Sequence, residues 1–136
     1  NINFMFKIII ASGPVIVEDN KVLLAQHGDT NFWKFCGGRI KDDEASLIET
    51  AKRKVSEEMG INIEILNSEP FLMHTIKEMG EEKVDVILVH YLAQRVGEVK
   101  PGGDIRKWAW VDISNLEQED LAPNILPALR HFGFIK

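Results

Sequence analysis

The sequence has one cysteine, one tyrosine and no hydrophobic run long enough to cross a bilayer. A single cysteine, Cys36, excludes a disulfide within the chain and a cysteine-rich zinc site, and it suits a reducing cytoplasm. The longest apolar candidate, Val84–Ala93, is interrupted by Asp85 and His90, and falls short of the roughly 20 residues that span a membrane. The first ten residues also lack a secretory signal pattern. We therefore expect a cytoplasmic protein without a membrane segment.

The sequence also has no excess of basic residues. Sixteen Lys and Arg stand against 21 Asp and Glu, which gives a net charge of -5. This balance argues against general nucleic-acid binding through phosphate attraction, although it is compatible with a local basic pocket. The length of 136 residues predicts one domain, 1–136, because two cores would leave each about 68 residues, near the lower limit of independent stability.

The pattern of apolar residues predicts a strand-rich chain. A strand over Phe4–Ala11 is followed by Gly13-Pro14, which we expect to interrupt it. The turn at residues 18–20 predicts a hairpin between Val15–Val17 and Val22–Ala25. Further strands are predicted at Ile61–Leu66, Phe71–Ile76, Val84–Gln94 and Trp108–Val111.

Two helices are predicted, over Ala45–Met59 and Asn124–Phe132. The first has apolar residues at intervals of three and four, and Gly60 is suited to end it. Because strands outnumber helices and the first helix lies between groups of strands, the order predicts a mixed sheet covered by helices.

The first helix carries an anomaly. With Leu47 at zero on a helical wheel, Glu58 falls at about 20°, inside the apolar arc, whose other members lie between about 40° and 120°. A carboxylate on that face is costly unless it is paired, hydrogen-bonded or bound to a metal. Glu57 and Glu58 also lie in the last turn, where the helix dipole disfavours negative charge, so together they indicate a cation site. Ordinary surface ion pairs with Arg53 and Lys54 are the alternative that helix geometry leaves open.

One segment resembles the signature of the Nudix hydrolases, G-x5-E-x7-R-E-U-x-E-E-x-G-U, in which U is aliphatic. It extends from Gly37 to Ile61 and reads GGRIKDDEASLIETAKRKVSEEMGI. The matching residues are Gly38, Glu44, Arg53, Val55, Glu57, Glu58, Gly60 and Ile61. The resemblance implies an α/β (α+β) fold, the family's alpha-beta-alpha sandwich, with a mixed central sheet, a long metal-site helix and a C-terminal helix.

The segment departs from the signature in two places. Eight residues instead of seven separate Glu44 from Arg53, so either the turn before the helix has an extra residue or Ala45 takes the first glutamate position. Lys54 stands where the family has a glutamate that is usually a metal ligand. Its ammonium would compete with a cation for the neighbouring carboxylates, so we expect weakened metal-dependent activity. Direct binding of a substrate phosphate by Lys54 is the alternative.

The resemblance implies the chemistry of the site. Nudix enzymes cleave a diphosphate linked to another moiety and use Mg2+ or Mn2+, hard cations that take oxygen ligands. Carried over by position, the metal ligands are the Gly38 carbonyl, Glu57, Glu58 and Glu44. The catalytic set is Glu57, Glu58, Arg53 as a residue that orients a glutamate, and Asp104, which precedes Trp110 by six residues. For Asp104 the alternatives are a turn aspartate or replacement by Asp85 or the Glu81-Glu82 pair.

Candidate substrate-binding residues are Trp33, Arg39, Lys54 and Asn124. Trp33 lies in the loop before the glycines, where an aromatic ring either stacks on a base or anchors the loop to the core. Asn124 lies near the place of a base-reading asparagine in relatives, but we favour its role as a helix N-cap. His90 alternates with apolar residues and is expected to be a buried histidine with satisfied hydrogen bonds.

The resulting hypothesis is a Mg2+-dependent pyrophosphohydrolase that acts on a nucleoside triphosphate or a nucleotide sugar, with a role in sanitising the nucleotide pool. The alternative is a Nudix-fold nucleotide-binding or regulatory module that has lost turnover through Lys54. By analogy with relatives, a homodimer is expected.

Overall fold

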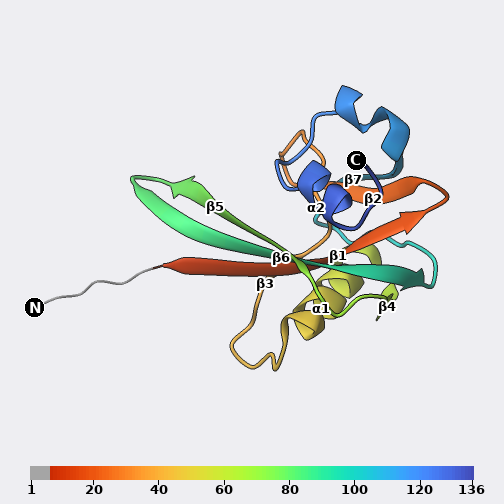
Figure 1. Ribbon diagram of the computed structural model, residues 1–136. Coiled ribbons are helices and arrows are strands. Elements are labelled where there is room, and N and C mark those ends of the chain that lie inside the picture. Colours follow the sequence, from red (N-terminus) through yellow and green to blue (C-terminus); the bar gives the residue numbers. More distant parts are fainter. Residues whose placement is uncertain (1–6) are drawn as a thin grey trace, which may run out of the picture.

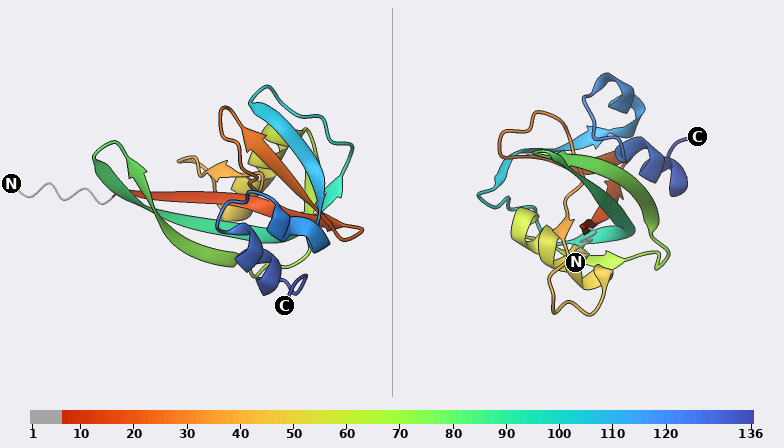
Figure 2. Two further views of the ribbon diagram at one scale, coloured as in Figure 1. Left: turned by 90° about the horizontal axis from the view of Figure 1, so that it is seen from above. Right: turned by 90° about the vertical axis from the view of Figure 1, so that its left-hand side faces the viewer.

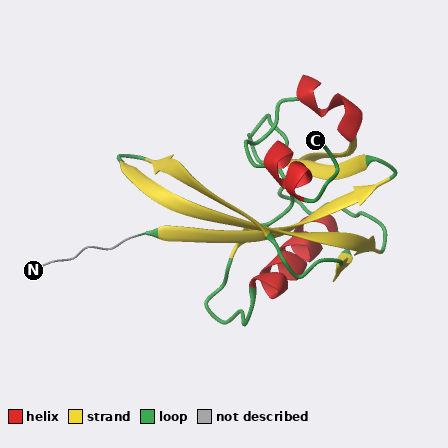
Figure 3. Ribbon diagram, viewed as in Figure 1, coloured by secondary structure: helices red, strands yellow, loops and turns green. Residues whose placement is uncertain are grey.

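The computed structural model describes residues 7–136, and within them seven strands form one sheet (Figure 1). The strands are β1 (Ile8–Glu18), β2 (Lys21–His27), β3 (Gly38–Arg39), β4 (Asn62–Ile65), β5 (Phe71–Met79), β6 (Glu82–Val96) and β7 (Ile105–Asp112). The helices are α1 (Leu47–Met59), the 3-10 helix η1 (Ile113–Gln118) and α2 (Ile125–His131). Figure 3 shows how strongly strands predominate in this part of the chain.

The sheet is mixed, as predicted. Its strand order is β4-β6-β1-β2-β7, with β3 paired to β1 and β5 paired to β6. The two long strands β1 and β6 run parallel, while the other pairs are antiparallel. The β1–β2 turn has positive φ at Asp19 and Asn20, which is the conformation that a tight hairpin requires.

Helices cover both faces of the sheet, which confirms the predicted sandwich (Figure 2). Successive side chains of a strand point to opposite faces, so neighbours in β1 enter different cores. Val15 packs on the face that carries α2 and η1, whereas Ile16 packs on the face that carries α1. In β2, Leu24 and Leu23 divide in the same way. The two strands thereby anchor both layers.

Strand β1 corrects one prediction. It continues through Gly13 and Pro14, where an interruption was expected, because β6 pairs with it in parallel from Ile8 to Ile16. Pro14 lies between the parts of β1 that pair with β3 and with β2, a position where its missing N–H is tolerated. The predicted start of this strand, residues 4–6, lies outside the described residues.

Helix α1 begins two residues later than predicted and ends where expected. Ser46 caps its first turn by accepting a hydrogen bond from the Glu49 N–H at 3.2 Å. Gly60 ends it with φ of 67°, a left-handed conformation that favours glycine. Ser12 of β1 donates to the Leu47 carbonyl at 2.6 Å and so fixes the start of α1 against the sheet.

The remaining differences concern two short elements that were not predicted and the ends of α2 and of several strands. Helix α2 is one residue shorter than predicted at each end, and β3 and η1 were not predicted. Strands β5 and β6 extend further than expected, and their hairpin projects beyond the helices (Figure 2). None of the helices in residues 7–136 is long and apolar enough to cross a membrane.

Candidate active site

The Gly37–Arg39 segment pairs with β1 and also contacts Arg53 and Glu58 of α1. A side chain on Gly13 would collide with the Cys36 carbonyl oxygen, so β1 and this segment can approach closely because glycine stands there. Strand β3 pairs with Ala11 and Ser12. Backbone groups of the segment thereby face the last turns of α1.

Glu58 lies within the core face of α1, as the helical wheel predicted, and is 7% exposed. Its Oε1 accepts a hydrogen bond from the Gly37 N–H at 3.0 Å. Its Oε2 lies 3.2 Å from His27 Nε2, although this nitrogen is not aligned for a hydrogen bond. The carboxylate is therefore held at the Gly37 backbone rather than on an open helix surface.

Arg53 joins three parts of the site. Its Nε and Nη2 donate to the two oxygens of Glu44 at 2.8 and 3.0 Å, and its Nη1 donates to Glu57 at 3.1 Å. Nη2 also donates to the Arg39 carbonyl at 2.8 Å. These hydrogen bonds lower the pKa of Glu57 and raise the pKa of Arg53. The guanidinium thus fixes Glu57 relative to β3.

Glu44 resolves the irregular spacing of the signature. Besides Arg53, it accepts hydrogen bonds from the Lys41 N–H and the Thr50 hydroxyl, each at 2.8 Å. The Arg53 hydrogen bond is the main reason that the pKa of Glu44 falls to about 2. Glu44, and not Ala45, is therefore the partner of Arg53, and the extra residue belongs to the turn before α1. Because its oxygens already accept from these donors, Glu44 serves here to hold Arg53.

Lys54 lies between the two glutamates at the end of α1. Its Nζ is 3.4 Å from Glu57 Oε2 and 3.7 Å from Glu58 Oε2. Its stem covers Gly38, since a side chain on that glycine would collide with Lys54. The ion pairs given above as the alternative to a cation site thus exist, but one of their acids, Glu58, is buried. An ammonium of the chain occupies the place between the two carboxylates.

A pocket of about 480 Å³ adjoins this cluster. Its walls come mainly from apolar side chains of β1, β6 and the loop before Gly37, including Ile9, Phe32 and Leu88. Lys34, Arg39 and Lys77 add positive charge, and no acidic side chain of residues 7–136 lines it. Gly37, Gly38 and Arg39 border the pocket on one side and contact the α1 cluster on the other.

The family model for the NUDIX domain matches residues 9–132. The chain belongs to the Nudix family. Among solved structures, the ORF135 protein of E. coli is 25% identical with a TM-score of 0.73, covering 93% of this chain and 89% of that one. The MutT protein of Methanosarcina mazei Go1 is 25% identical with a TM-score of 0.71 and 96% coverage of both chains.

A third structure shows the same fold at lower identity. An ADP-ribose pyrophosphatase of Streptococcus suis is 20% identical, with a TM-score of 0.66 and coverage of 90% of this chain and 87% of that one. No curated protein matches the sequence.

Nudix enzymes generally use divalent metals, and two residues of this chain fit a magnesium ion. Mg2+ is usually bound through one or two carboxylates together with water and substrate phosphates. Glu57 and Glu58 supply two carboxylates beside the Gly38 backbone, whereas Lys54 must move aside for a cation to reach both. Residues 7–136 contain no group of three or more His, Cys, Asp or Glu side chains arranged to hold a metal. Glu57 and Glu58 therefore fit a metal ion whose other ligands are water and substrate phosphates better than one that is bound by the protein alone.

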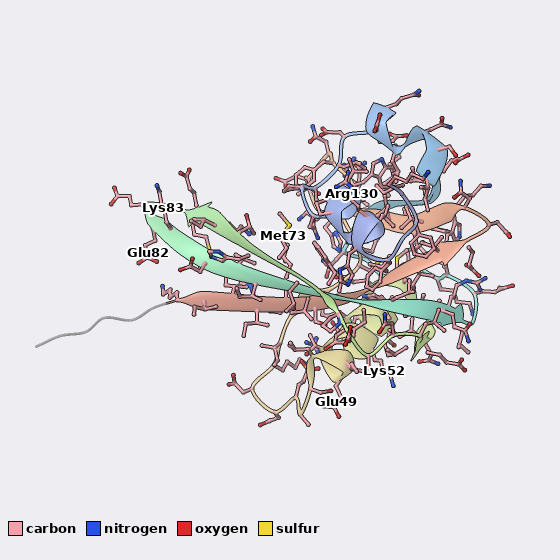
Figure 4. All side chains as sticks on the ribbon, viewed as in Figure 1. Glu49, Lys52, Met73, Glu82, Lys83 and Arg130 are labelled. Carbon is pink, nitrogen blue, oxygen red and sulfur yellow. The ribbon has the colours of Figure 1, made fainter. Side chains whose placement is uncertain are left out.

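Asp104 lies in the exposed turn before β7 of the Nudix fold. The same turn packs against the end of α1, where the Gly102 N–H donates to the Glu58 carbonyl at 2.8 Å. The proposed catalytic role of Asp104 stays a prediction. The alternative donors lie on the projecting hairpin, where Asp85 pairs with His74 at 2.7 Å and Glu82 with Lys7 at 3.2 Å. Figure 4 shows Glu82 at the far end of that hairpin, away from α1.

The candidate substrate-binding residues lie in three different places. Arg39 and Asn124 line the pocket, and Lys54 lies at the α1 cluster. Trp33 is 6% exposed in the core beside α2, and its indole Nε1 donates to Glu119 at 3.4 Å. The structure therefore corrects its placement: Trp33 anchors the loop, and the neighbouring Phe32 lines the pocket.

Asn124 also differs from the favoured prediction. It occupies the N-cap position of α2, but its side chain makes no capping hydrogen bond. Its Nδ2 donates to His90 Nε2 at 2.8 Å instead. His90 is buried with both ring nitrogens bonded, as predicted.

Sequence reasoning missed His27, Lys34 and Lys77. His27 ends β2 and reaches Glu58 of α1 through the packing of the sheet on the helix. Lys34 and Lys77 meet at the pocket from a loop and from β5. Their spacing in the sequence carries no signal, because contacts between distant segments depend on strand pairing.

Proposed function

We propose that this Nudix protein is a Mg2+- or Mn2+-dependent pyrophosphohydrolase that cleaves a nucleoside diphosphate linked to another moiety. The substrate class is a nucleoside triphosphate or a nucleotide sugar, and removal of unwanted nucleotides from the cellular pool is the proposed role. Family membership supports hydrolysis of a phosphoric anhydride. The organic part of the substrate lies in the pocket, and its phosphates extend toward α1.

The shared wall formed by Gly37–Arg39 carries this proposal. A cleft with apolar walls and three cations suits a flat ring joined to an anionic chain. On the other side of the same wall are Glu57 and Glu58. A molecule bound across it would therefore place its ring and its phosphates in two environments of matching chemistry.

Each residue at the phosphate end has a proposed part. Glu57 and Glu58, with the Gly38 carbonyl, would hold the metal, which neutralises phosphate charge and promotes attack by water on phosphorus. Arg53 positions Glu57, and Glu44 positions Arg53 through the hydrogen bonds described above. The Gly37 N–H keeps Glu58 directed toward the Gly-Gly segment.

The test is hydrolysis of a panel of nucleoside triphosphates and nucleotide sugars by wild type and by Glu58→Gln. The amide keeps the shape of the side chain and an acceptor for Gly37, but it removes the charge, so we expect a loss of at least about 100-fold in kcat/KM. Glu49→Gln is the matched control, because Glu49 is an exposed acid of the same helix. Equal activity of wild type and Glu58→Gln would contradict the proposal.

A nucleotide-binding module without turnover is the second candidate. Lys54 favours it, because its ammonium already bridges Glu57 and Glu58. Tight nucleotide binding combined with no hydrolysis of any panel member in Mg2+ or Mn2+ would support the module. Turnover that is lost in Glu58→Gln would support the enzyme.

A further inference from the structure

The side chain of His27, the last residue of β2, lies beside Glu58 near the end of α1. Side chains alternate along β2, and Leu23 and Ala25 pack on the face that carries α1, so His27 points to the same face. Its backbone is fixed as well, because its N–H donates to the Thr30 hydroxyl at 3.2 Å and its carbonyl accepts from the Thr30 N–H at 2.9 Å. The ring therefore reaches the site from the sheet rather than from the helix.

Both ring nitrogens of His27 are sealed from solvent, and neither has a hydrogen-bond partner among residues 7–136. Nε2 lies 3.2 Å from Glu58 Oε2, but the nitrogen is not directed at that oxygen, so the contact is not a hydrogen bond. An ordinary hydrogen-bonded pair would align the two groups. Buried polar groups are nearly always partnered, so the nitrogen beside Glu58 calls for a third group.

Glu58 Oε2 is in a similar state. The Gly37 N–H is bonded to the other oxygen, Oε1, and within the described part of the chain no donor makes a hydrogen bond to Oε2. Lys54 Nζ is 3.7 Å away, which is beyond hydrogen-bond distance. A ring nitrogen and a carboxylate oxygen thus lie side by side without being directed at each other. This is the arrangement of two donor atoms that share one partner.

The separation of these two atoms fits a shared metal ion. Donor atoms that each lie about 2.1 Å from one ion are about 3.0 Å apart at a right angle and about 3.4 Å apart at the tetrahedral angle. The 3.2 Å between His27 Nε2 and Glu58 Oε2 lies between these values. Residues 7–136 hold no larger group of ligands, so water and phosphate oxygens would complete the coordination.

An imidazole ligand changes which metal a site prefers. Mg2+ takes oxygen ligands, whereas imidazole suits transition ions, whose affinity for a mixed nitrogen and oxygen site rises from Mn2+ to Ni2+. We propose that His27 is a nitrogen ligand of the metal held by Glu57 and Glu58, so that the site binds a transition ion in preference to Mg2+. The inference rests on the proposed function in that the ion is the one that contacts the substrate phosphates. The signature on α1 supplies oxygen ligands, and His27 adds nitrogen from a strand outside it.

The experiment is pulsed electron paramagnetic resonance of Mn2+ bound to the whole chain in the presence of methylenediphosphonate, an uncleavable diphosphate mimic that contains no nitrogen. A second sample carries histidine labelled with the heavy nitrogen isotope. A ring nitrogen bound to Mn2+ couples to the electron spin of the metal, so we expect a nitrogen coupling that changes with the isotope. This readout requires neither turnover nor a variant that folds.

His27→Gln assigns the coupling to one residue, because its amide offers an oxygen ligand but no ring nitrogen. We expect the coupling to vanish and the preference for Ni2+ over Mg2+, measured by competition with bound Mn2+, to fall about 10-fold. The matched control is His74→Gln, since His74 is an exposed histidine that pairs with Asp85. It should keep the coupling and the wild-type preference. If His27→Gln does not fold, retention of the coupling in glutamine variants of the other three histidines assigns it by elimination.

The outcomes separate this inference from the proposed activity. Bound Mn2+ without a histidine coupling, a coupling lost in His74→Gln, or an unchanged metal preference in His27→Gln would overturn the inference, and so would failure of Mn2+ to bind. The hydrolysis panel tests the activity independently of these results. Absence of hydrolysis with the His27 coupling intact would overturn the proposed activity alone.

Discussion

The two sides of the Gly37–Arg39 segment differ in how they handle polar groups. Toward α1, charges stand in pairs: Arg53 with Glu44 and Glu57, and Lys54 with Glu57 and Glu58. Toward the pocket, the buried polar groups are neutral, and the hydrogen-bonded pair of His90 and Asn124 is surrounded by apolar side chains.

This difference matches two tasks. Paired charges can be rearranged when a cation or a phosphate enters, because each carboxylate exchanges one positive partner for another. Neutral buried hydrogen bonds are directional and costly to leave unsatisfied, so they hold one geometry. The α1 side is suited to chemistry with charged groups, and the pocket side to a fixed arrangement of neutral groups.

Gly13→Ala should disturb both sides at once and give the largest effect. The added methyl group would collide with the Cys36 carbonyl and force β1 away from the Gly37 segment. We expect a loss of at least about 3 kcal/mol in the free energy of unfolding, measured by urea denaturation. Gly103→Ala is the control, since a methyl group at Gly103 meets no neighbour within 4 Å. Equal stability of the two variants would show that the close approach is not required.

Acid should destabilise the fold because the buried His90, beside the pocket, resists protonation. The pKa of His90 is about 4 in the folded chain and near 6.5 when unfolded, so the unfolded state binds the proton first as the pH falls. His90 should therefore lower the free energy of unfolding of wild type by up to about 3 kcal/mol as the pH falls from about 6.5 to 4. Urea denaturation across this range should show a shallower pH dependence for His90→Gln, while His74→Gln should follow wild type. If the free energy of unfolding depended on pH in the same way in wild type and in His90→Gln, a lowered pKa of His90 would be contradicted.

Lys54→Glu should strengthen metal binding on the α1 side. It replaces the ammonium between Glu57 and Glu58 by a third carboxylate, so Mn2+ binding measured by electron paramagnetic resonance should tighten by about 10-fold or more. Hydrolysis should also become faster. Lys52→Glu, which changes an exposed lysine of the same helix, is the control. If Mn2+ affinity and turnover stayed at the wild-type level, Lys54 would not be the residue that weakens the site.

The α1 side was largely predictable from sequence. Arg53, Lys54, Glu57 and Glu58 lie three and four positions apart, so helix geometry alone brings them together. The burial of Glu58 followed from the same wheel. The role of Glu44 was not predictable, because it depends on the path of the turn that returns its side chain to Arg53.

The pocket side was predicted less well. Periodicity indicated a buried His90, but it could not name Asn124 as its partner, and a capping role for Asn124 was favoured. Trp33 and Phe32 are adjacent, and the sequence could not tell which ring enters the core and which lines the pocket. The bonding of Asn124 depends on how α2 packs on the sheet.

Sequence by itself determined most of the strand and helix pattern, the family signature and the row of charges on α1, because these depend on residues close together in the chain. Tertiary structure decided that His27 meets Glu58, that Lys54 covers Gly38, and that β1, β6 and α2 join through His90. Those contacts link segments far apart in the chain, and they exist because β6 pairs in parallel with β1 and helices pack on both faces of the resulting sheet.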